Sequence, residues 1–192
     1  RTVRPANLAG ATNSFVSLFR RRSGEATSWL SIDDGTPLVH VTDDKTDKRH
    51  KHVVVDFRHK GYHVDYTRRS ATREHHREKL YRLPEGEDVH DLASLAAALR
   101  SWRPNKGDEA YSHLVFKRRL WHVGVRFRGE DRIREGRRSF GAWRYDGVAR
   151  KLNSKTLAPT STRSRPFTLW LSKNRFRIPV RAVIQTPKHT LE

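Results

Sequence analysis

The sequence contains no cysteine and no methionine. Without cysteine, disulfide frameworks, cysteine-ligated zinc and cysteine catalysis are all excluded. The cellular compartment stays open on this count, because exported proteins can fold without disulfides. The absence of methionine indicates that the chain does not begin at a translation start. A cleaved signal peptide and a truncated or disordered N-terminus are both open explanations.

Long apolar runs and acidic residues are also scarce. No run of about 18 apolar residues occurs, so we expect no membrane-spanning helix. The 21 Asp and Glu residues face 40 Lys and Arg residues, which gives a net charge of +19. Such a charge attracts polyanions, so nucleic acid, anionic lipid and an acidic protein surface all fit as partners. The alternative is a solvated basic surface with no dedicated ligand.

The length and the aromatic content predict a folded core. A chain of 192 residues is long enough for one ordinary domain, and five Trp, five Tyr and eight Phe supply large buried areas. We predict an irregular N-terminal docking segment over residues 1–25 and a single β-rich domain over residues 26–192. The docking hypothesis rests on two aromatic residues beside a basic run: Phe15, Phe19, Arg20, Arg21 and Arg22. The alternative is that these aromatics simply pack on the core.

Strands are predicted in the first half of the chain because Asp- and Gly-containing turns separate short apolar runs. Tyr62, Val64 and Tyr66 alternate with polar residues, which is typical of a half-buried strand. The predicted strands are residues 27–32, 37–42, 51–57 and 61–66, and the charged stretch 67–87 is predicted to be a surface strand pair or a long loop.

One amphipathic helix is predicted over residues 88–102. Asp88 is the expected N-cap and Asp91 takes the capping-box position. An apolar stripe runs along one face of this helix and should pack on the sheet: Val89, Leu92, Leu95, Ala96, Leu99 and Trp102.

Further strands are predicted at residues 120–128, 139–145, 167–172 and 176–184. Because Pro179 cannot donate a ladder hydrogen bond, its strand should lie at a sheet edge or carry a bulge. Residues 151–166 are rich in Ser, Thr, Pro and Arg, which predicts a long mobile loop.

The second half of the chain resembles a family of bacterial exported proteins known as domain of unknown function 3108. The resemblance covers about residues 87–184. It rests on the order and spacing of Asp88-Val89-His90-Asp91-Leu92-Ala93-Ser94-Leu95, Leu99-Arg100, Gly107, the strand 121–128, Phe140-Gly141-Ala142, Leu169-Trp170-Leu171-Ser172 and Arg177-Ile178-Pro179-Val180-Arg181.

The resemblance implies a mainly β fold: a strongly curved antiparallel sheet, half-open and barrel-like, with one amphipathic helix packed on it. It also implies an exported, periplasmic location, and it provides no family active site that could be assigned to this chain. A concave sheet face commonly holds an apolar ligand, and a weak likeness to periplasmic lipoprotein carriers makes a lipid or lipoprotein carrier an alternative function.

Catalytic and metal sites are not expected. His90, Asp91 and Ser94 lie close in sequence, but on a helix Asp91 is rotated by about 100° from His90, which is wrong for a triad. His50 and His52 share a strand face, yet the sequence shows no carboxylate cluster beside them to complete a metal site. We therefore predict no enzyme activity, no cofactor and no metal.

The predicted binding surface consists of arginines, whose planar heads grip anions bidentately. They are Arg126, Arg128, Arg132, Arg134, Arg137, Arg138, Arg175, Arg177 and Arg181. We expect a membrane-associated accessory or stabilising subunit that docks through this surface on an anionic membrane or an acidic membrane-protein complex. Nucleic-acid binding driven by net charge is the other alternative, although no nucleic-acid motif is visible.

Overall fold

The computed structural model describes residues 23–46, 48–59, 61–84 and 87–185. These residues form two antiparallel sheets and one helix, and the second sheet curls strongly into a half-barrel. This confirms the predicted fold class, with the addition of a separate five-stranded sheet. Among the described residues, no helix has the length and apolar character needed to cross a membrane.

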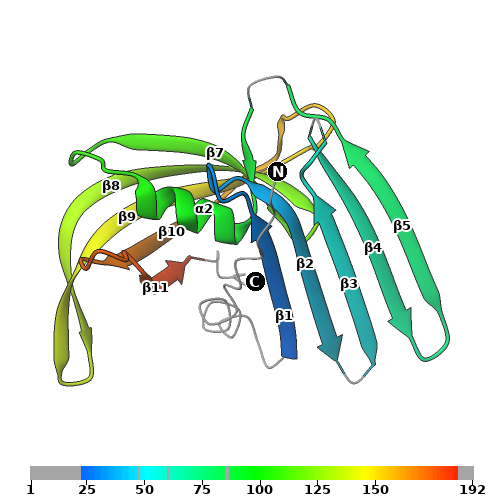
Figure 1. Cartoon of the computed structure of the whole chain (residues 1–192), viewed down its shortest axis with the longest axis horizontal. Helices are drawn as coiled ribbons and strands as arrows, with labels where there is room; N and C mark the ends of the chain where they lie inside the picture. Colours follow the sequence, from blue (N-terminus) through cyan, green and yellow to red (C-terminus); the bar gives the residue numbers. More distant parts are fainter. Residues whose placement is uncertain (1–22, 47, 60, 85–86, 186–192) are drawn as a thin grey trace, which may run out of the picture. The chain divides into compact units, whose positions relative to one another are not determined.

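Sheet A is a meander in which each strand pairs with the next along the chain (Figure 1). Val55 of the third strand pairs with Val64 of the fourth, and Val53 pairs with Tyr66, so their side chains share one face. All four are buried, as the alternating pattern predicted for Val64 and Tyr66. The strands are β1 (Ser23–Leu30), β2 (Pro37–Thr46), β3 (Arg49–Asp56), β4 (Tyr62–Ser70) and β5 (Glu74–Tyr81).

Sheet B has the order β11-β10-β9-β8-β7-β6, and Figure 1 shows the long β8 and β9 ribbons bending along their length. The register shifts between Phe127 and Gly129, and Gly129 has a φ of 98°, which marks a β-bulge in β8. Bulges of this kind increase strand curvature. The strands are β6 (Val89–His90), β7 (Glu109–Phe116), β8 (Arg119–Glu135), β9 (Arg138–Leu152), β10 (Pro159–Ser172) and β11 (Pro179–Ile184).

The apolar alternation in β8 produces the core of sheet B. Trp121, Val123, Val125 and Phe127 are all less than 9% exposed. Tyr145 of β9 is fully buried, and its ring centroid lies 5.1 Å from that of Phe127.

The predicted mobile loop over residues 151–166 is wrong. Most of this stretch belongs to β9 and β10, with residues 153–158 as the connection. Pro159 pairs with Leu152, and after a register shift the ladder continues from Ser164 opposite Arg150. The stretch is polar because most of its side chains are exposed. Strands pair through backbone hydrogen bonds, which polar residues form as well as apolar ones. The polar composition of this stretch was therefore a misleading sign of a loop.

The predicted start of the helix is also wrong. Helix α2 (Leu92–Ser101) begins four residues later than Asp88, because Asp91 is the N-cap. The backbone N–H of Ser94 donates to Asp91 Oδ1 at 2.7 Å, and the Asp91 N–H donates to Ser94 Oγ at 3.0 Å. This reciprocal pair is a capping box with serine at the third position.

The strand predicted over residues 176–184 begins three residues later than expected, so Pro179 lies at its start and not inside it. Pro179 opens β11, which is an edge strand of sheet B, and the register between β10 and β11 shifts between Trp170 and Leu171, next to the Leu171–Pro179 pair. Both consequences predicted for this proline are therefore confirmed.

Residue contacts divide the chain into two compact units. Unit 1 contains the described residues up to Leu95 together with Leu114–Arg119, and therefore all of sheet A. Unit 2 contains Ala96–His113 and the described residues from Leu120 onward, and therefore most of sheet B and the last two turns of α2.

Candidate functional site

The hairpin that joins β8 to β9 carries four arginines at its end. Gly136 has a φ of 60°, which suits a tight turn, and all four arginine side chains are exposed. None of them forms an ion pair with an acidic residue in the described part of the chain. We call this group the basic hairpin: Arg132, Arg134, Arg137 and Arg138.

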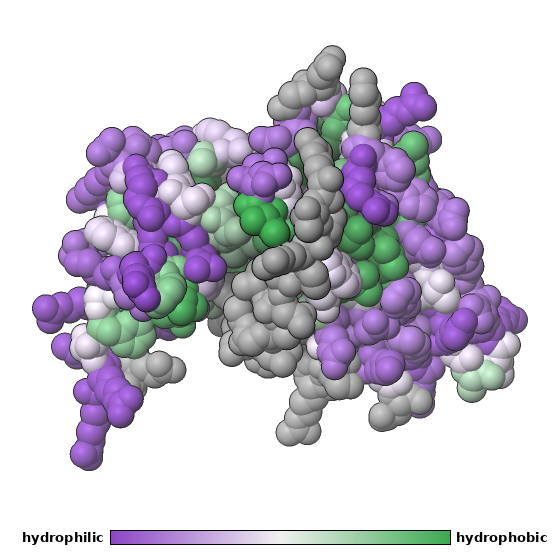
Figure 2. All heavy atoms as spheres, in the orientation of Figure 1, coloured by the Kyte–Doolittle hydropathy of each residue, from purple (hydrophilic) through white to green (hydrophobic). Residues whose placement is uncertain are grey.

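Strand geometry places two members of the basic hairpin on one face. Arg132 and Arg134 alternate with Ile133, which is only 5% exposed. Ile133 therefore anchors the hairpin while its two neighbours point to solvent. Figure 2 shows hydrophilic side chains over most of the described surface seen in this view.

Arg126 and Arg128 also belong to the predicted surface, but each is bound to a carboxylate. Arg126 Nε donates to Glu109 at 2.6 Å, and Arg128 Nε donates to Asp146 at 2.8 Å. Burial alone would raise the pKa of Asp146, but hydrogen bonds from Arg144 and Arg128 outweigh it and lower that pKa. These two arginines are therefore largely neutralised within the fold.

Arg177 is a correction to the predicted surface, because only 6% of it is exposed. Its guanidinium donates to the Tyr145 hydroxyl at 2.7 Å and to the backbone carbonyl of Trp102. Sequence alternation could not reveal this, because the acceptors lie 32 and 75 residues away. Arg177 ties the end of α2 to β9 and is not available to an external partner.

Arg175 and Arg181 remain at the surface and lie against aromatic rings. The guanidinium carbons lie 4.6 Å from the Phe176 centroid and 5.3 Å from the Trp170 centroid, respectively. Several large apolar side chains close to these arginines in sequence are also exposed: Phe176, Ile178, Val180, Val183 and Ile184.

The predicted N-terminal docking residues lie outside the described part of the chain. These are Phe15, Phe19, Arg20, Arg21 and Arg22.

A buried cluster combines serine, histidine and aspartate in unit 1. Ser28 Oγ lies 2.8 Å from His40 Nδ1, and the fully buried Asp91 places Oδ2 3.3 Å from the same nitrogen. In a nucleophilic triad the serine and the aspartate bind opposite ring nitrogens, so this geometry is not that of a triad. The cluster joins β1 and β2 to the start of α2.

The sequence missed the carboxylate partner of His50 and His52. Asp43 of β2 lies opposite His52, and its Oδ1 is 2.8 Å from His50 Nε2 and 3.0 Å from His52 Nδ1. Burial alone would raise the pKa of Asp43, but the hydrogen bonds from His52 and His50 lower it. Both histidine rings therefore contact the same carboxylate oxygen of Asp43.

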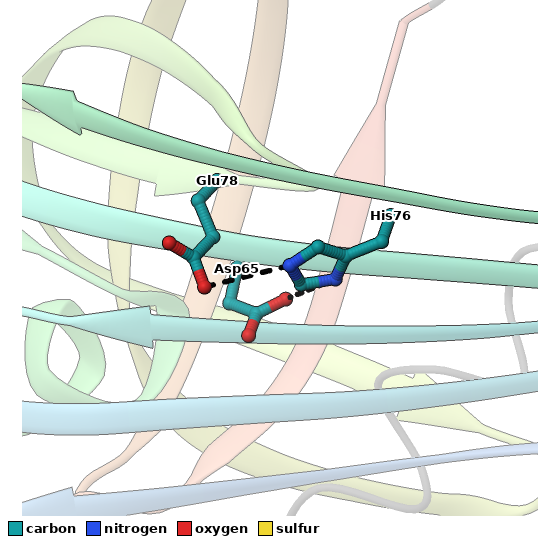
Figure 3. A group of neighbouring side chains, drawn as sticks. All are labelled: Asp65, His76 and Glu78. Atoms are coloured by element: carbon teal, nitrogen blue, oxygen red, sulfur yellow. Dashed lines mark ion pairs between the residues drawn. The ribbon is translucent and has the colours of Figure 1, made fainter.

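A second histidine lies between two carboxylates on β4 and β5 (Figure 3). His76 Nδ1 is 3.4 Å from Asp65, and His76 Nε2 is 3.4 Å from Glu78. The two carboxylates thus occupy different nitrogens of one ring, and all three side chains are at least one-third exposed. One ligand atom from each side chain lies within 4.8 Å of the other two, which is compatible with a metal ion, but exposed acidic groups are commonly grouped in this way without one, so we assign no metal to this trio.

Comparison with known protein families gives a match that covers nearly the whole chain. The sequence pattern of the family described as "Protein of unknown function (DUF3108)" matches residues 1–191. The chain belongs to the DUF3108 family. The match includes sheet A, so the family relation extends well beyond the residues 87–184 on which the resemblance was first seen. No curated protein and no solved structure matches the DUF3108 chain.

Proposed function

We propose that this DUF3108 protein is a non-enzymatic exported protein that docks on an anionic membrane through the basic surface of unit 2, as an accessory or stabilising subunit. The observation that carries the proposal is the basic hairpin. Its four exposed arginines have no acidic partner among the described residues, so their charge is available to an external anion.

Neighbouring apolar residues favour a membrane over an acidic protein complex. Lys173, in the connection between β10 and β11, forms an ion pair with Glu130 at 2.6 Å, two residues before the first arginine of the basic hairpin. The same connection leads into Phe176 and Ile178, which are 50% and 45% exposed. Cations beside exposed apolar side chains are typical of surfaces that bind the interface of an anionic bilayer.

The carrier alternative has less support, because other protein side chains cover the face of sheet B that carries Tyr145. The Trp102 ring lies 6.0 Å from Tyr145, and the buried guanidinium of Arg177 bonds to both residues. An apolar ligand there would have to displace a buried charge together with two aromatic rings.

Vesicle binding tests the proposal. The hairpin variant, Arg134→Ser with Arg137→Ser, removes two exposed charges from the basic hairpin. We expect it to bind phosphatidylglycerol-containing vesicles about thirtyfold more weakly than the wild type in co-sedimentation, because each of the two surface cations contributes about 1 kcal/mol near an anionic bilayer.

The control variant, Lys155→Asn with Arg163→Ser, removes the same charge from exposed positions in the β9–β10 region that form no ion pair in the described structure. It should bind nearly as well as the wild type. Equal losses in both variants, or binding of the wild type to phosphatidylcholine vesicles alone, would contradict the proposal. Selective capture of DNA or of an acidic membrane complex in place of vesicles would favour one of the other partner classes.

A further inference from the structure

Unit 1 contains a pocket whose lining is cationic and aromatic. Its volume is about 190 Å³, and it opens between the edge of sheet A and the turn that joins β7 to β8. The lining residues Lys117, Arg118 and Arg119 lie in the segment Leu114–Arg119, which belongs to unit 1. The lining has five cations, two tyrosines and no carboxylate: Val64, Tyr66, Arg77, Lys79, Tyr81, Lys117, Arg118 and Arg119.

Three of the five cations of this pocket, Lys79, Lys117 and Arg118, lie over aromatic rings. The Arg118 guanidinium carbon lies 3.6 Å from the Tyr66 ring centroid, and Lys79 Nζ lies 4.6 Å from that of Tyr81. None of the five forms an ion pair with a described acidic residue. The Arg118 guanidinium thus lies over the Tyr66 ring, and its N–H donors form no hydrogen bond with the described residues.

The turn between β7 and β8 holds two of the lining cations in a strained backbone conformation. Lys117 and Arg118 have φ values of 50° and 66°, and two positive values in a two-residue hairpin are the mark of a type I′ turn. Such turns favour Asn-Gly, because residues with a larger side chain are strained in this conformation. Lys117 and Arg118 at these two positions therefore lower the local stability of the turn relative to Asn-Gly.

Protection of a sheet edge explains only part of the cluster. Lysine and arginine on the edge strand β5 discourage pairing with another chain, which accounts for Arg77 and Lys79. It does not account for Lys117 and Arg118, which come from another element and occupy strained positions.

We propose that this pocket binds a phosphate group carrying two negative charges. The lining has five cations and no carboxylate, which is more charge than one carboxylate can neutralise, and arginine forks match the oxygens of a phosphate. The volume is below the roughly 300 Å³ at which pockets for drug-sized ligands begin, so a phosphate or diphosphate group fits and a bulky apolar ligand does not. The phosphate belongs either to a small soluble molecule or to a lipid headgroup. The proposal does not depend on membrane docking by unit 2.

Titration calorimetry with pyrophosphate tests the proposal on the whole chain. The pocket variant, Lys117→Asn with Arg118→Gly, installs the residues that the turn prefers. We expect affinity for pyrophosphate to fall about tenfold or more, through loss of two charge-assisted contacts, while the melting temperature stays the same or rises. Arg119→Gln is a second variant, on strand β8, that lowers affinity without altering the turn.

The hairpin variant is the matched control, since it removes two cations from unit 2. It should bind pyrophosphate as the wild type does. The proposal is overturned if the wild type does not bind pyrophosphate or phosphatidate, if the pocket variant binds like the wild type, or if the hairpin variant loses as much affinity as the pocket variant.

Vesicles distinguish the two sources of the phosphate. Phosphatidate carries a phosphomonoester with two charges, whereas phosphatidylglycerol carries a singly charged diester. If the pocket variant loses preference for phosphatidate over phosphatidylglycerol, the ligand is a lipid headgroup. If the variant loses only pyrophosphate binding, the ligand is a soluble phosphate compound. A failure of docking by unit 2 would lower binding to both vesicle types and leave pyrophosphate binding intact.

Discussion

Two buried tyrosines differ in whether the hydroxyl has a hydrogen-bond partner, and this difference should determine what each hydroxyl contributes to stability. Tyr62 and Tyr145 are both fully buried, and burial raises the pKa of each phenol. The Tyr145 hydroxyl accepts a hydrogen bond from Arg177 at 2.7 Å. The Tyr62 hydroxyl has no hydrogen-bond partner among the described residues.

The same substitution should therefore have opposite effects at these two positions. Tyr145→Phe leaves part of a buried guanidinium without its acceptor and should lower the free energy of unfolding by about 1.5–3 kcal/mol. Tyr62→Phe removes an unsatisfied hydroxyl and should leave stability unchanged or raise it by about 1 kcal/mol. Urea denaturation of both variants checks the pair. A similar loss in both would mean that the Tyr62 hydroxyl has a partner.

Helix α2 depends on a carboxylate that does more than cap it. Asp91 caps the helix and lies beside His40. Burial alone would raise the pKa of Asp91, but the hydrogen bond and charge of His40 lower it below the ordinary 3.8. Because the folded-state pKa is below the unfolded one, the stabilisation is fully present above about pH 3.8 and is lost as the pH falls through the folded-state pKa.

Substitutions at Asp91 separate the cap from the charge. Asp91→Asn keeps a capping side chain, so its unfolding free energy should approach that of the wild type as the pH falls below about 3.8. Asp91→Ala also loses the cap and should be less stable than Asp91→Asn by about 1 kcal/mol at neutral pH. Chemical denaturation across this pH range provides the measurement. A constant gap between wild type and Asp91→Asn would show that the charge plays no part.

At the level of elements, the sequence revealed most of what depends on local pattern. The alternation around Tyr62 and in residues 121–127 predicted buried strand faces correctly, and Pro179 predicted an irregular edge. The start of α2 and the strand character of residues 151–166 were missed. The cap of α2 is a local signal, because Ser94 lies three residues after Asp91, whereas the polar strand in residues 151–166 is defined by backbone pairing with β9.

The candidate sites were less predictable than the fold. Exposure of the basic hairpin followed from its charge and turn residues. The burial of Arg177 and the neutralisation of Arg126 and Arg128 depend on contacts with distant residues. The unit 1 pocket was missed for the same reason, although its signal is present in the sequence, since Lys117-Arg118 lies between two apolar runs where a hairpin would ordinarily carry Asn-Gly.

At the scale of the whole molecule, the net charge of +19 comes from cations in two different situations. Several arginines are bound to carboxylates within the fold, whereas the basic hairpin and the unit 1 pocket keep cations without acidic partners among the described residues. Each unit therefore has its own cationic surface. We interpret the hairpin as a docking surface and the pocket as a site for a defined anion.

The salt dependence of vesicle binding tests the docking claim most directly. Affinity for phosphatidylglycerol-containing vesicles would be measured over a range of salt concentrations for the wild type and the hairpin variant. Salt screens exposed charges, so the wild-type affinity should fall steeply with salt and that of the hairpin variant should fall less steeply. Equal slopes for the two proteins would contradict the account, because the arginines at the end of the hairpin would then not contact the membrane.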